Sequence, residues 1–426
     1  MSEENVTIIS SDGHAGALMA DYRPYLDPEY RDEFDDFLTE WNEKGSRNFD
    51  PPALRARLDA EYVEEWNEKM VVTGRIDGFP DAAVRLREVE REGIAAEVLF
   101  PDFGLPFELY SRTLASALGH PPLDEAHRRA AYRAFNRWVA DYVSIAPERF
   151  AAMGIVSWHD VDDAMADIRA LPDLGLRGLV LPEFDLKLPL YHPTYEPVWS
   201  LIEELGLVVN SHSGLSSTSN HVIYTPGVPH PACAIRLWVP EAFFFTHNIL
   251  NHLIWGGVLE RHPSIKVTFT EQGSAWVPPT LVEMDYAYEG SYFRTDYKDV
   301  IRLRPSEYFA RQCYIGSSIF SKAEVAQRHL IGLDKMMLGM DFPHHEGTLV
   351  QTTQEYLRAT VGDAGVPRDE AHTLLCGNAA KVFGFDLAKL GPVAARIGLT
   401  WDDVLTPPST NLFPRGDVHK PAALHI

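Results

Sequence analysis

The sequence of 426 residues predicts one α/β domain, a distorted (β/α)8 barrel of the TIM type that spans residues 1–426. Three observations predict it: a series of short apolar segments, helical periodicity between several of them, and a possible metal ligand directly after four of them. The carboxyl ends of parallel barrel strands surround one mouth, so ligands that are distant in sequence can meet there. The pattern therefore predicts both a fold and the place of its chemistry.

The candidate strands alternate with helical segments. Apolar side chains recur at spacings of three and four between Ala131 and Tyr142, and Asp160 is placed to cap a helix that carries Ala164 and Ile168. Repeated strand and helix alternation is typical of a barrel. The expected strands are Val6–Ser11, Ala95–Phe100, Phe150–Val156, Gly178–Leu181, Leu207–Asn210, Lys266–Thr270, Cys313–Ile315 and Met336–Gly339.

Three segments exceed a minimal barrel. Residues 15–90, which are acidic and rich in aromatics, are expected to form a helical insertion after the first strand. Residues 216–246 are expected to form a loop at the active site or at a subunit interface, with a core helix as the alternative for Phe243–Phe245. Residues 387–426 are expected to form a C-terminal extension that ends in a proline-bearing tail.

Composition limits the partners. The formal net charge of -23 would repel a phosphate backbone, so no nucleic acid is expected. No stretch reaches the roughly 18 apolar residues of a membrane span, so no membrane partner is expected either. The three cysteines form no paired framework, which favours a reducing compartment, and the cytoplasm is the expected location. The expected partner is a small-molecule or peptide-derived substrate.

Four residues are the candidate metal ligands. Asp12 and His14 lie two apart at a strand end and can leave on the same face, although an Asp-Gly pair is also a common turn. His212 follows the fifth candidate strand, and Asp341 follows the eighth. Two imidazoles and two carboxylates suit one divalent ion, with zinc favoured and manganese or iron as alternatives.

Several motifs carry a family resemblance. The sequence resembles the amidohydrolase superfamily, in the branch that includes aminocarboxymuconate semialdehyde decarboxylase and resorcylate decarboxylase. Such proteins hold one divalent ion in a distorted barrel by a His-x-His pair, a fifth-strand histidine and an eighth-strand aspartate. The motifs are Ser10–His14, Glu97–Pro101, Asn210–Gly214, Gly256–Pro263, Gly339–His344, and Gly377–Ala380 with Phe383–Gly384.

The resemblance implies a role for each ligand. By this resemblance, Asp12 and His14 correspond to the first-strand pair of ligands, and His212 corresponds to the fifth-strand ligand. Asp341 corresponds to a ligand that also accepts and donates protons. Two positions depart from the family pattern, because Asp12 and Glu271 stand where histidines are usual. Both changes replace a neutral nitrogen with an anionic oxygen, which favours a harder ion.

Further residues are candidates for catalysis or substrate binding. Glu271 could orient a water molecule or a ligating histidine. Alternatively, Glu271 is a buried acid with a purely structural role. His344 is a candidate acid or base just past Asp341. His345, Arg177 and His221 are candidate substrate contacts.

Metal-dependent hydrolysis of an amide, amidine or related carbon–nitrogen bond is the leading expectation. A bound divalent ion lowers the pKa of its water to about 7, and Asp341 could pass the proton to a leaving amine. Glu271 favours this reaction, because an additional anion disfavours an anionic substrate. The first alternative is non-oxidative decarboxylation of an aromatic or unsaturated acid, and the second is a non-catalytic scaffold. The apolar Phe243–Phe245 run and the tail predict a homo-oligomer, a dimer or larger.

Overall fold

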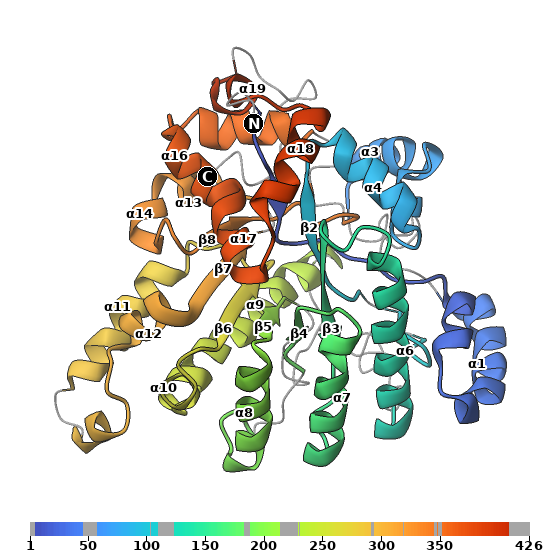
Figure 1. Ribbon diagram of the computed structural model, residues 1–426, viewed down its shortest axis with the longest axis horizontal. Helices are drawn as coiled ribbons and strands as arrows, with labels where there is room; N and C mark the ends of the chain where they lie inside the picture. The colour runs from blue at the N-terminus through green and yellow to red at the C-terminus, as the bar shows by residue number, and fades with distance from the viewer. Residues whose placement is uncertain are drawn as a thin grey trace.

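The computed structural model is a parallel barrel. It describes residues 5–45, 58–102, 104–109, 123–182, 188–213, 229, 231–290, 294–317, 319–344, 347 and 352–408. All eight expected strands are confirmed, and they pair in sequence order, each parallel to the next (Figure 1). They are β1 (Ile9–Ser10), β2 (Ala96–Leu99), β3 (Phe150–Ile155), β4 (Gly178–Val180), β5 (Val208–His212), β6 (Lys266–Thr270), β7 (Cys313–Ser317) and β8 (Met336–Leu338).

Backbone hydrogen bonds between the first and last strands close the barrel. The Ser11 amide donates to the Leu338 carbonyl at 2.7 Å, and the Asp341 amide donates to the Asp12 carbonyl at 3.0 Å. A parallel bridge between Gly13 and Phe342 continues this pairing past the strand ends. The segments after β1 and β8 are therefore held side by side at the mouth.

Helices cover the outside of the barrel (Figure 1). The predicted cap is confirmed, because the Asp160 carboxylate accepts from the Asp163 amide at 2.9 Å and starts a helix that buries Ala164 and Ile168. Among the described residues, no helix is long and apolar enough to cross a membrane. The helices are α1 (Arg31–Lys44), α3 (Ala60–Trp66), α4 (Ala82–Arg91), α6 (Glu125–Val143), α7 (Val161–Asp173), α8 (Glu196–Leu205), α9 (Pro231–Trp255), α10 (Val258–Arg261), α11 (Val277–Glu289), α12 (Pro305–Gln312), α13 (Lys322–Ala326), α14 (Arg328–Ile331), α15 (Thr353–Leu357), α16 (Arg368–His372), α17 (Asn378–Phe383), α18 (Leu387–Ile397) and α19 (Trp401–Leu405).

The C-terminal helices close one end of the barrel. Val382 and Phe383 of α17 and Leu390 of α18 share an apolar cluster with the inward residues Ile9 and Met153 of β1 and β3. This plug lies toward the amino ends of the strands, so the carboxyl ends form the accessible mouth. Residues 409–426 of the expected extension lie outside the described residues.

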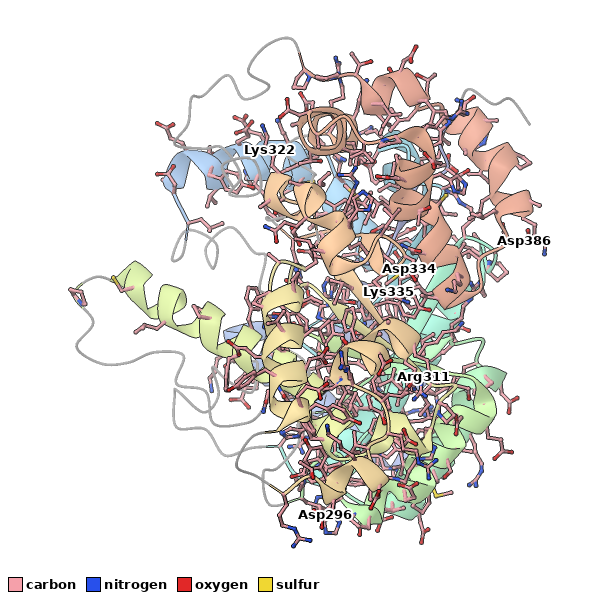
Figure 2. All side chains as sticks on the ribbon, turned by 90° about the vertical axis from the view of Figure 1, so that its left-hand side faces the viewer. Asp296, Arg311, Lys322, Asp334, Lys335 and Asp386 are labelled. Carbon is pink, nitrogen blue, oxygen red and sulfur yellow. The ribbon has the colours of Figure 1, made fainter. Side chains whose placement is uncertain are left out.

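Residues 15–90 are helical in much of their described part, as expected, and part of the expected loop at residues 216–246 is helical too. Residues 15–90 contain α1, α3 and most of α4, with 3-10 helices at Met19–Tyr25, Pro28–Tyr30 and Arg75–Gly78 and a π-helix at Asn67–Val72. Residues 231–246, expected as a loop, form the first part of α9, which extends from the body of the molecule in Figure 2. The helix accommodates Pro240, and its Phe244 side chain is 63% exposed. Residues 216–228 of that expected loop are outside the described part.

A fully buried ion pair connects α4 to the barrel. The Arg85 guanidinium donates to both carboxylate oxygens of Glu97 on β2, each at 2.8 Å, and neither side chain is exposed. It also donates to the His14 carbonyl at 2.9 Å and lies 3.8 Å from the ring centroid of Phe342. A Cβ atom at Gly13 would collide with the Glu97 carboxylate, which explains the glycine there. One guanidinium thus joins segments from β1, β2 and β8.

We expect the Glu97→Gln variant to lower the free energy of unfolding by about 3 to 5 kcal/mol, because it leaves the Arg85 charge buried without its partner. Urea denaturation measures this change. The control is Asp363→Asn, which removes an ion pair with Lys322 whose side chains are 47% and 43% exposed, and we expect an effect below about 1 kcal/mol. Equal effects of the two substitutions would contradict a stabilising role for the buried pair.

Candidate metal centre

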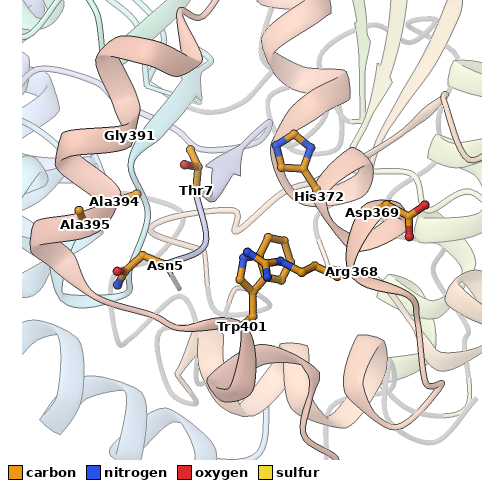
Figure 3. A pocket seen from close by; sticks show the side chains of 9 residues that line it. All are labelled: Asn5, Thr7, Arg368, Asp369, His372, Gly391, Ala394, Ala395 and Trp401. Atoms are coloured by element: carbon orange, nitrogen blue, oxygen red, sulfur yellow. The ribbon is translucent and has the colours of Figure 1, made fainter. Parts of the chain in front are cut away.

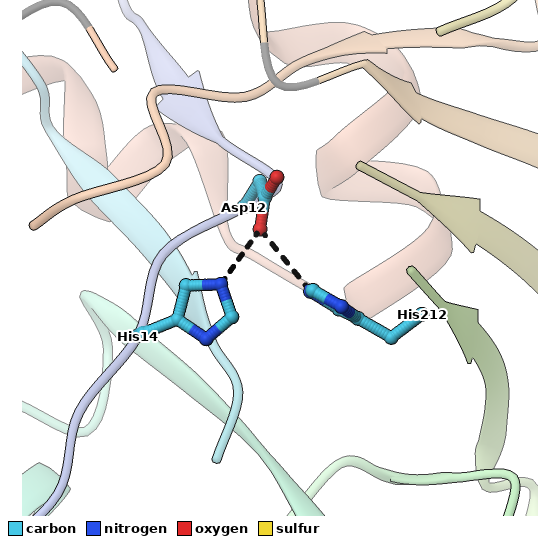
Figure 4. A group of neighbouring side chains, drawn as sticks. All are labelled: Asp12, His14 and His212. Carbon is cyan, nitrogen blue, oxygen red and sulfur yellow. Dashed lines mark ion pairs between the residues drawn. The ribbon is translucent and has the colours of Figure 1, made fainter. Parts of the chain in front are cut away.

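The first candidate ligands come from the segment after β1. Asp12 and His14 are buried, and the Asp12 Oδ1 atom lies 3.9 Å from the His14 Nε2 atom. The same oxygen lies 3.4 Å from Nε2 of His212, which ends β5 (Figure 4). Suitable ligand atoms of these three residues all lie within 4.8 Å of one another. Ligands separated by about half the chain therefore converge at the mouth.

Asp341 completes the predicted set from the segment after β8. Its Oδ1 atom lies 3.4 Å from Nε2 of His14, and its side chain is buried. Its backbone φ is 52°, and that of Glu271 after β6 is 58°, in the left-handed region that non-glycine residues rarely adopt. Such strain, of order 1 to 3 kcal/mol per residue, concentrates at functional sites. The structure thus brings all four predicted ligands together.

Hydrogen bonds orient both imidazoles for metal binding. Nδ1 of His14 lies 2.9 Å from the Pro101 carbonyl, and Nδ1 of His212 lies 2.9 Å from the Ser213 carbonyl. A carbonyl oxygen can only accept a hydrogen bond, so Nδ1 carries the proton and donates it, and Nε2 presents its lone pair to the cluster. Nε2 of His14 is buried and has no hydrogen-bond partner among the described residues. This donor set fits a divalent ion.

The two imidazoles differ in pKa. Burial, with His344 and His212 nearby, lowers the pKa of His14 to about 4, so this ring is neutral. Burial also lowers the pKa of His212, but the Asp12 carboxylate outweighs burial and raises it to about 9. A cation at Asp12 would compete with that proton, since metal ligands must be deprotonated.

A second acid and histidine border the ligand cluster. Glu271 Oε2 lies 3.4 Å from Nδ1 of His212, and burial together with Asp341 raises the pKa of Glu271 to about 7. His344 Nδ1 lies 3.0 Å from Asp341 Oδ1 and 3.9 Å from Glu271 Oε1. Burial opposes protonation of His344, but Asp341 and Asp102 raise its pKa well above the usual value.

Sequence reasoning missed two parts of this site. Asp102, three residues past β2, is buried and lies 3.4 Å from Nε2 of His344. Arg85 and Glu97 hold the backbone of the first-strand ligands. A charged residue within or just after a predicted buried strand, such as Glu97 or Asp102, was the available signal, because such charges require partners.

Of the three candidate substrate contacts, only Arg177 lies among the described residues, and it is not at the mouth. Arg177 precedes β4, and its guanidinium donates to the carbonyls of Phe383 at 2.9 Å and Pro147 at 2.8 Å. It therefore lies at the plugged amino end of the barrel, away from the cluster. His221 and His345 lie outside the described residues.

A separate cavity of about 530 Å³ contains none of the candidate ligands (Figure 3). It lies between the N-terminal segment and the helices α16, α18 and α19, and it includes Asn5, His372 and Trp401. The Arg368 guanidinium on its border lies 4.8 Å from the ring centroid of Trp401, and both Arg368 and His372 are exposed. The buried polar groups suited to catalysis are at the other end of the barrel.

Solved structures of low sequence identity share this fold. A 5-carboxyvanillate decarboxylase from Sphingomonas paucimobilis has a TM-score of 0.60 and 20% identity, covering 89% of this chain and 100% of that chain. A dihydroxybenzoic acid decarboxylase from Polaromonas sp. JS666, with bound manganese and the inhibitor 2-nitroresorcinol, has a TM-score of 0.57 and 16% identity, covering 90% and 99%.

A curated relative points to the same chemistry. The 2-amino-3-carboxymuconate-6-semialdehyde decarboxylase of Dictyostelium discoideum is 24% identical over 321 residues, 72% of this chain and 77% of the relative. These decarboxylases contradict the expectation of carbon–nitrogen bond hydrolysis, which was wrong. They support the alternative reaction.

The family of this chain follows from a match to a family model. The amidohydrolase family model matches residues 112–385, well over half of the chain. This range includes three features described above: the β5 histidine, the β6 glutamate and the β8 aspartate. The chain belongs to the amidohydrolase family.

Proposed function

We propose that this protein is a metal-dependent, non-oxidative decarboxylase of an aromatic or unsaturated carboxylic acid. The observation that carries the proposal is the convergence of Asp12, His14, His212 and Asp341 in a buried cluster beside a second histidine and acid. The decarboxylase names of the relatives support the choice of reaction. The four converging residues are the proposed ligands.

A divalent ion in this cluster would act as a Lewis acid toward a substrate carboxylate and an adjoining oxygen. Two imidazoles with carboxylates suit zinc, manganese or iron, and the acidic residues Asp12 and Glu271 increase the share of hard oxygen donors. The protein contributes preorganised ligand positions, since each imidazole is fixed by a backbone carbonyl.

The proton needed by the reaction can come from His344. Loss of CO2 leaves an electron pair on the substrate carbon, and a proton must replace the departing carboxylate. The His344 ring lies beside Asp341 and is 13% exposed, so it is accessible from the mouth. We assign His344 as the proton donor and Asp341 as the carboxylate that exchanges protons with it.

Glu271 does not exclude an anionic substrate, although a fixed negative charge at this position would repel one. Without a bound cation, burial and the neighbouring Asp341 raise the pKa of Glu271 to about 7, and a divalent cation held by the cluster would itself offset the repulsion of an anionic substrate. A neutral carboxyl can donate a hydrogen bond to an anionic substrate instead of repelling it.

The candidate cluster is expected to bind a divalent metal ion. We expect purified protein to bind one divalent ion per chain, and His14→Ala to weaken its affinity at least roughly 10- to 100-fold because a ligand is lost. Elemental analysis and competition with a chelator measure this, with zinc and manganese tested separately. His329→Ala, an exposed histidine on α14, is the control. A folded wild-type protein that binds neither ion would favour the scaffold alternative.

The metal-loaded protein is expected to catalyse decarboxylation. We expect metal-loaded protein to release one CO2 for each molecule of a hydroxy- or amino-substituted aromatic or unsaturated acid consumed. In D2O the product should carry one deuterium at the carbon that lost its carboxylate, because the replacing proton comes from solvent by way of the enzyme. Mass spectrometry detects both products. Consumption of an acid with addition of water and without CO2 would contradict the proposal.

The protein is expected to associate with copies of itself. We propose that two or more copies associate, in part through the projecting segment of α9, where Leu237 is 48% and Phe244 is 63% exposed. Sedimentation should show a species larger than one chain of 47.9 kDa. Phe244→Glu should shift it toward the single chain, and Val282→Glu, at a 70% exposed position of α11, serves as the control. A wild-type protein that sediments as a single chain would contradict association.

A further inference from the structure

We propose that Asp102 is a positioning residue for His344. Its carboxylate holds Nε2 of that ring, so that Nδ1 faces Asp341 and the mouth of the barrel. The kinetic consequence of this proposal rests on the decarboxylase function proposed above, whereas its structural consequence does not.

The geometry around His344 supports this role. Nε2 lies 3.4 Å from Asp102 Oδ2, and Nδ1 lies 3.0 Å from Asp341 Oδ1 on the other side of the ring. The Asp102 side chain is 3% exposed, and the His344 side chain is 13% exposed. The Asp102 and Asp341 carboxylates thus contact the two nitrogens of the His344 imidazole. The ring cannot rotate without losing both contacts.

The same loop also fixes the neighbouring metal ligand. The Pro101 carbonyl accepts from Nδ1 of His14 at 2.9 Å, and the next residue is Asp102. The rings of His14 and His344 are stacked, with centroids 4.2 Å apart and planes inclined by 21°. Consecutive residues after β2 therefore hold two stacked imidazoles, one by a backbone oxygen and one by a carboxylate.

This arrangement matters for the proton-transfer step. The bond between the substrate carbon and its carboxylate breaks, CO2 leaves, and the electron pair stays on carbon. Nδ1 of His344 gives its proton to that carbon, and water returns a proton to the ring. The Nε2 proton stays on the nitrogen that Asp102 holds, so the neutral ring after transfer is confined to one tautomer. Without Asp102, either nitrogen could carry the remaining proton.

Kinetics provide the first test. We expect Asp102→Ala to lower kcat roughly 10- to 100-fold, as for other groups that orient a catalytic histidine, with KM and bound metal unchanged. Asp102→Asn should restore most of kcat, because its amide oxygen can still accept from Nε2. The control is Asp334→Ala, an aspartate whose side chain is 65% exposed (Figure 2). Wild-type kcat in Asp102→Ala, or activity lost in proportion to bound metal, would overturn the proposal.

A spectroscopic test is independent of activity. In zinc-loaded protein with 15N-labelled histidine, recorded at a pH at which the His344 ring has lost one of its two protons, the His344 signals, assigned by their loss in His344→Gln, should report the remaining proton on Nε2 in the wild type and in Asp102→Asn. Asp102→Ala should show a mixture of tautomers at His344. Identical His344 signals in the wild type and Asp102→Ala would overturn positioning. If no acid were decarboxylated but the signals changed as expected, the proposed function would fail while the positioning role of Asp102 would stand.

Discussion

The site depends on one buried guanidinium. Arg85 pairs with Glu97 of β2 and also donates to the backbone at His14, while its charged plane covers the ring of Phe342 beside Asp341. A buried charge pair contributes little net stability compared with apolar packing, but removing either partner is costly, so the pair enforces one arrangement. Here that arrangement sets the relative positions of β1 and β8, whose following residues supply three of the four proposed ligands.

Backbone pairing beyond the strand ends maintains the strained conformations at the mouth. The Glu271 amide donates to the Gly316 carbonyl at 3.0 Å, and the Asp341 amide donates to the Asp12 carbonyl at 3.0 Å. Both acids have positive φ, which directs their side chains in ways that a continuing strand would not. The cooperative hydrogen bonds of the barrel compensate for this local strain. The barrel thus stabilises the strained backbone conformations of Glu271 and Asp341.

Much of the fold and the convergence of the four candidate ligands could be predicted, because both depend on local patterns. Each strand is a short apolar run, and each ligand lies at or just after a strand end. Positions before a strand are different: Arg177 lies at the opposite end of the barrel because it precedes β4. Asp102 escaped prediction because its partner His344 is 242 residues away, a distance that no periodicity reports. The first part of α9 was expected as a loop, with a core helix as the alternative for Phe243–Phe245; the helix contains Pro240, and proline usually ends a helix.

Electrostatics explain why so many acids can share this mouth. Without a cation, burial and the neighbouring Asp341 raise the pKa of Glu271 to about 7, whereas burial lowers the pKa of His212 but Asp12 and Glu271 outweigh it and raise that pKa to about 9. A divalent cation near Asp12 would supply the same positive charge and displace the His212 proton. As a proposed ligand, Asp12 would therefore do more than donate an oxygen. It would make proton release and cation binding one linked equilibrium, in which acidic conditions oppose the ion.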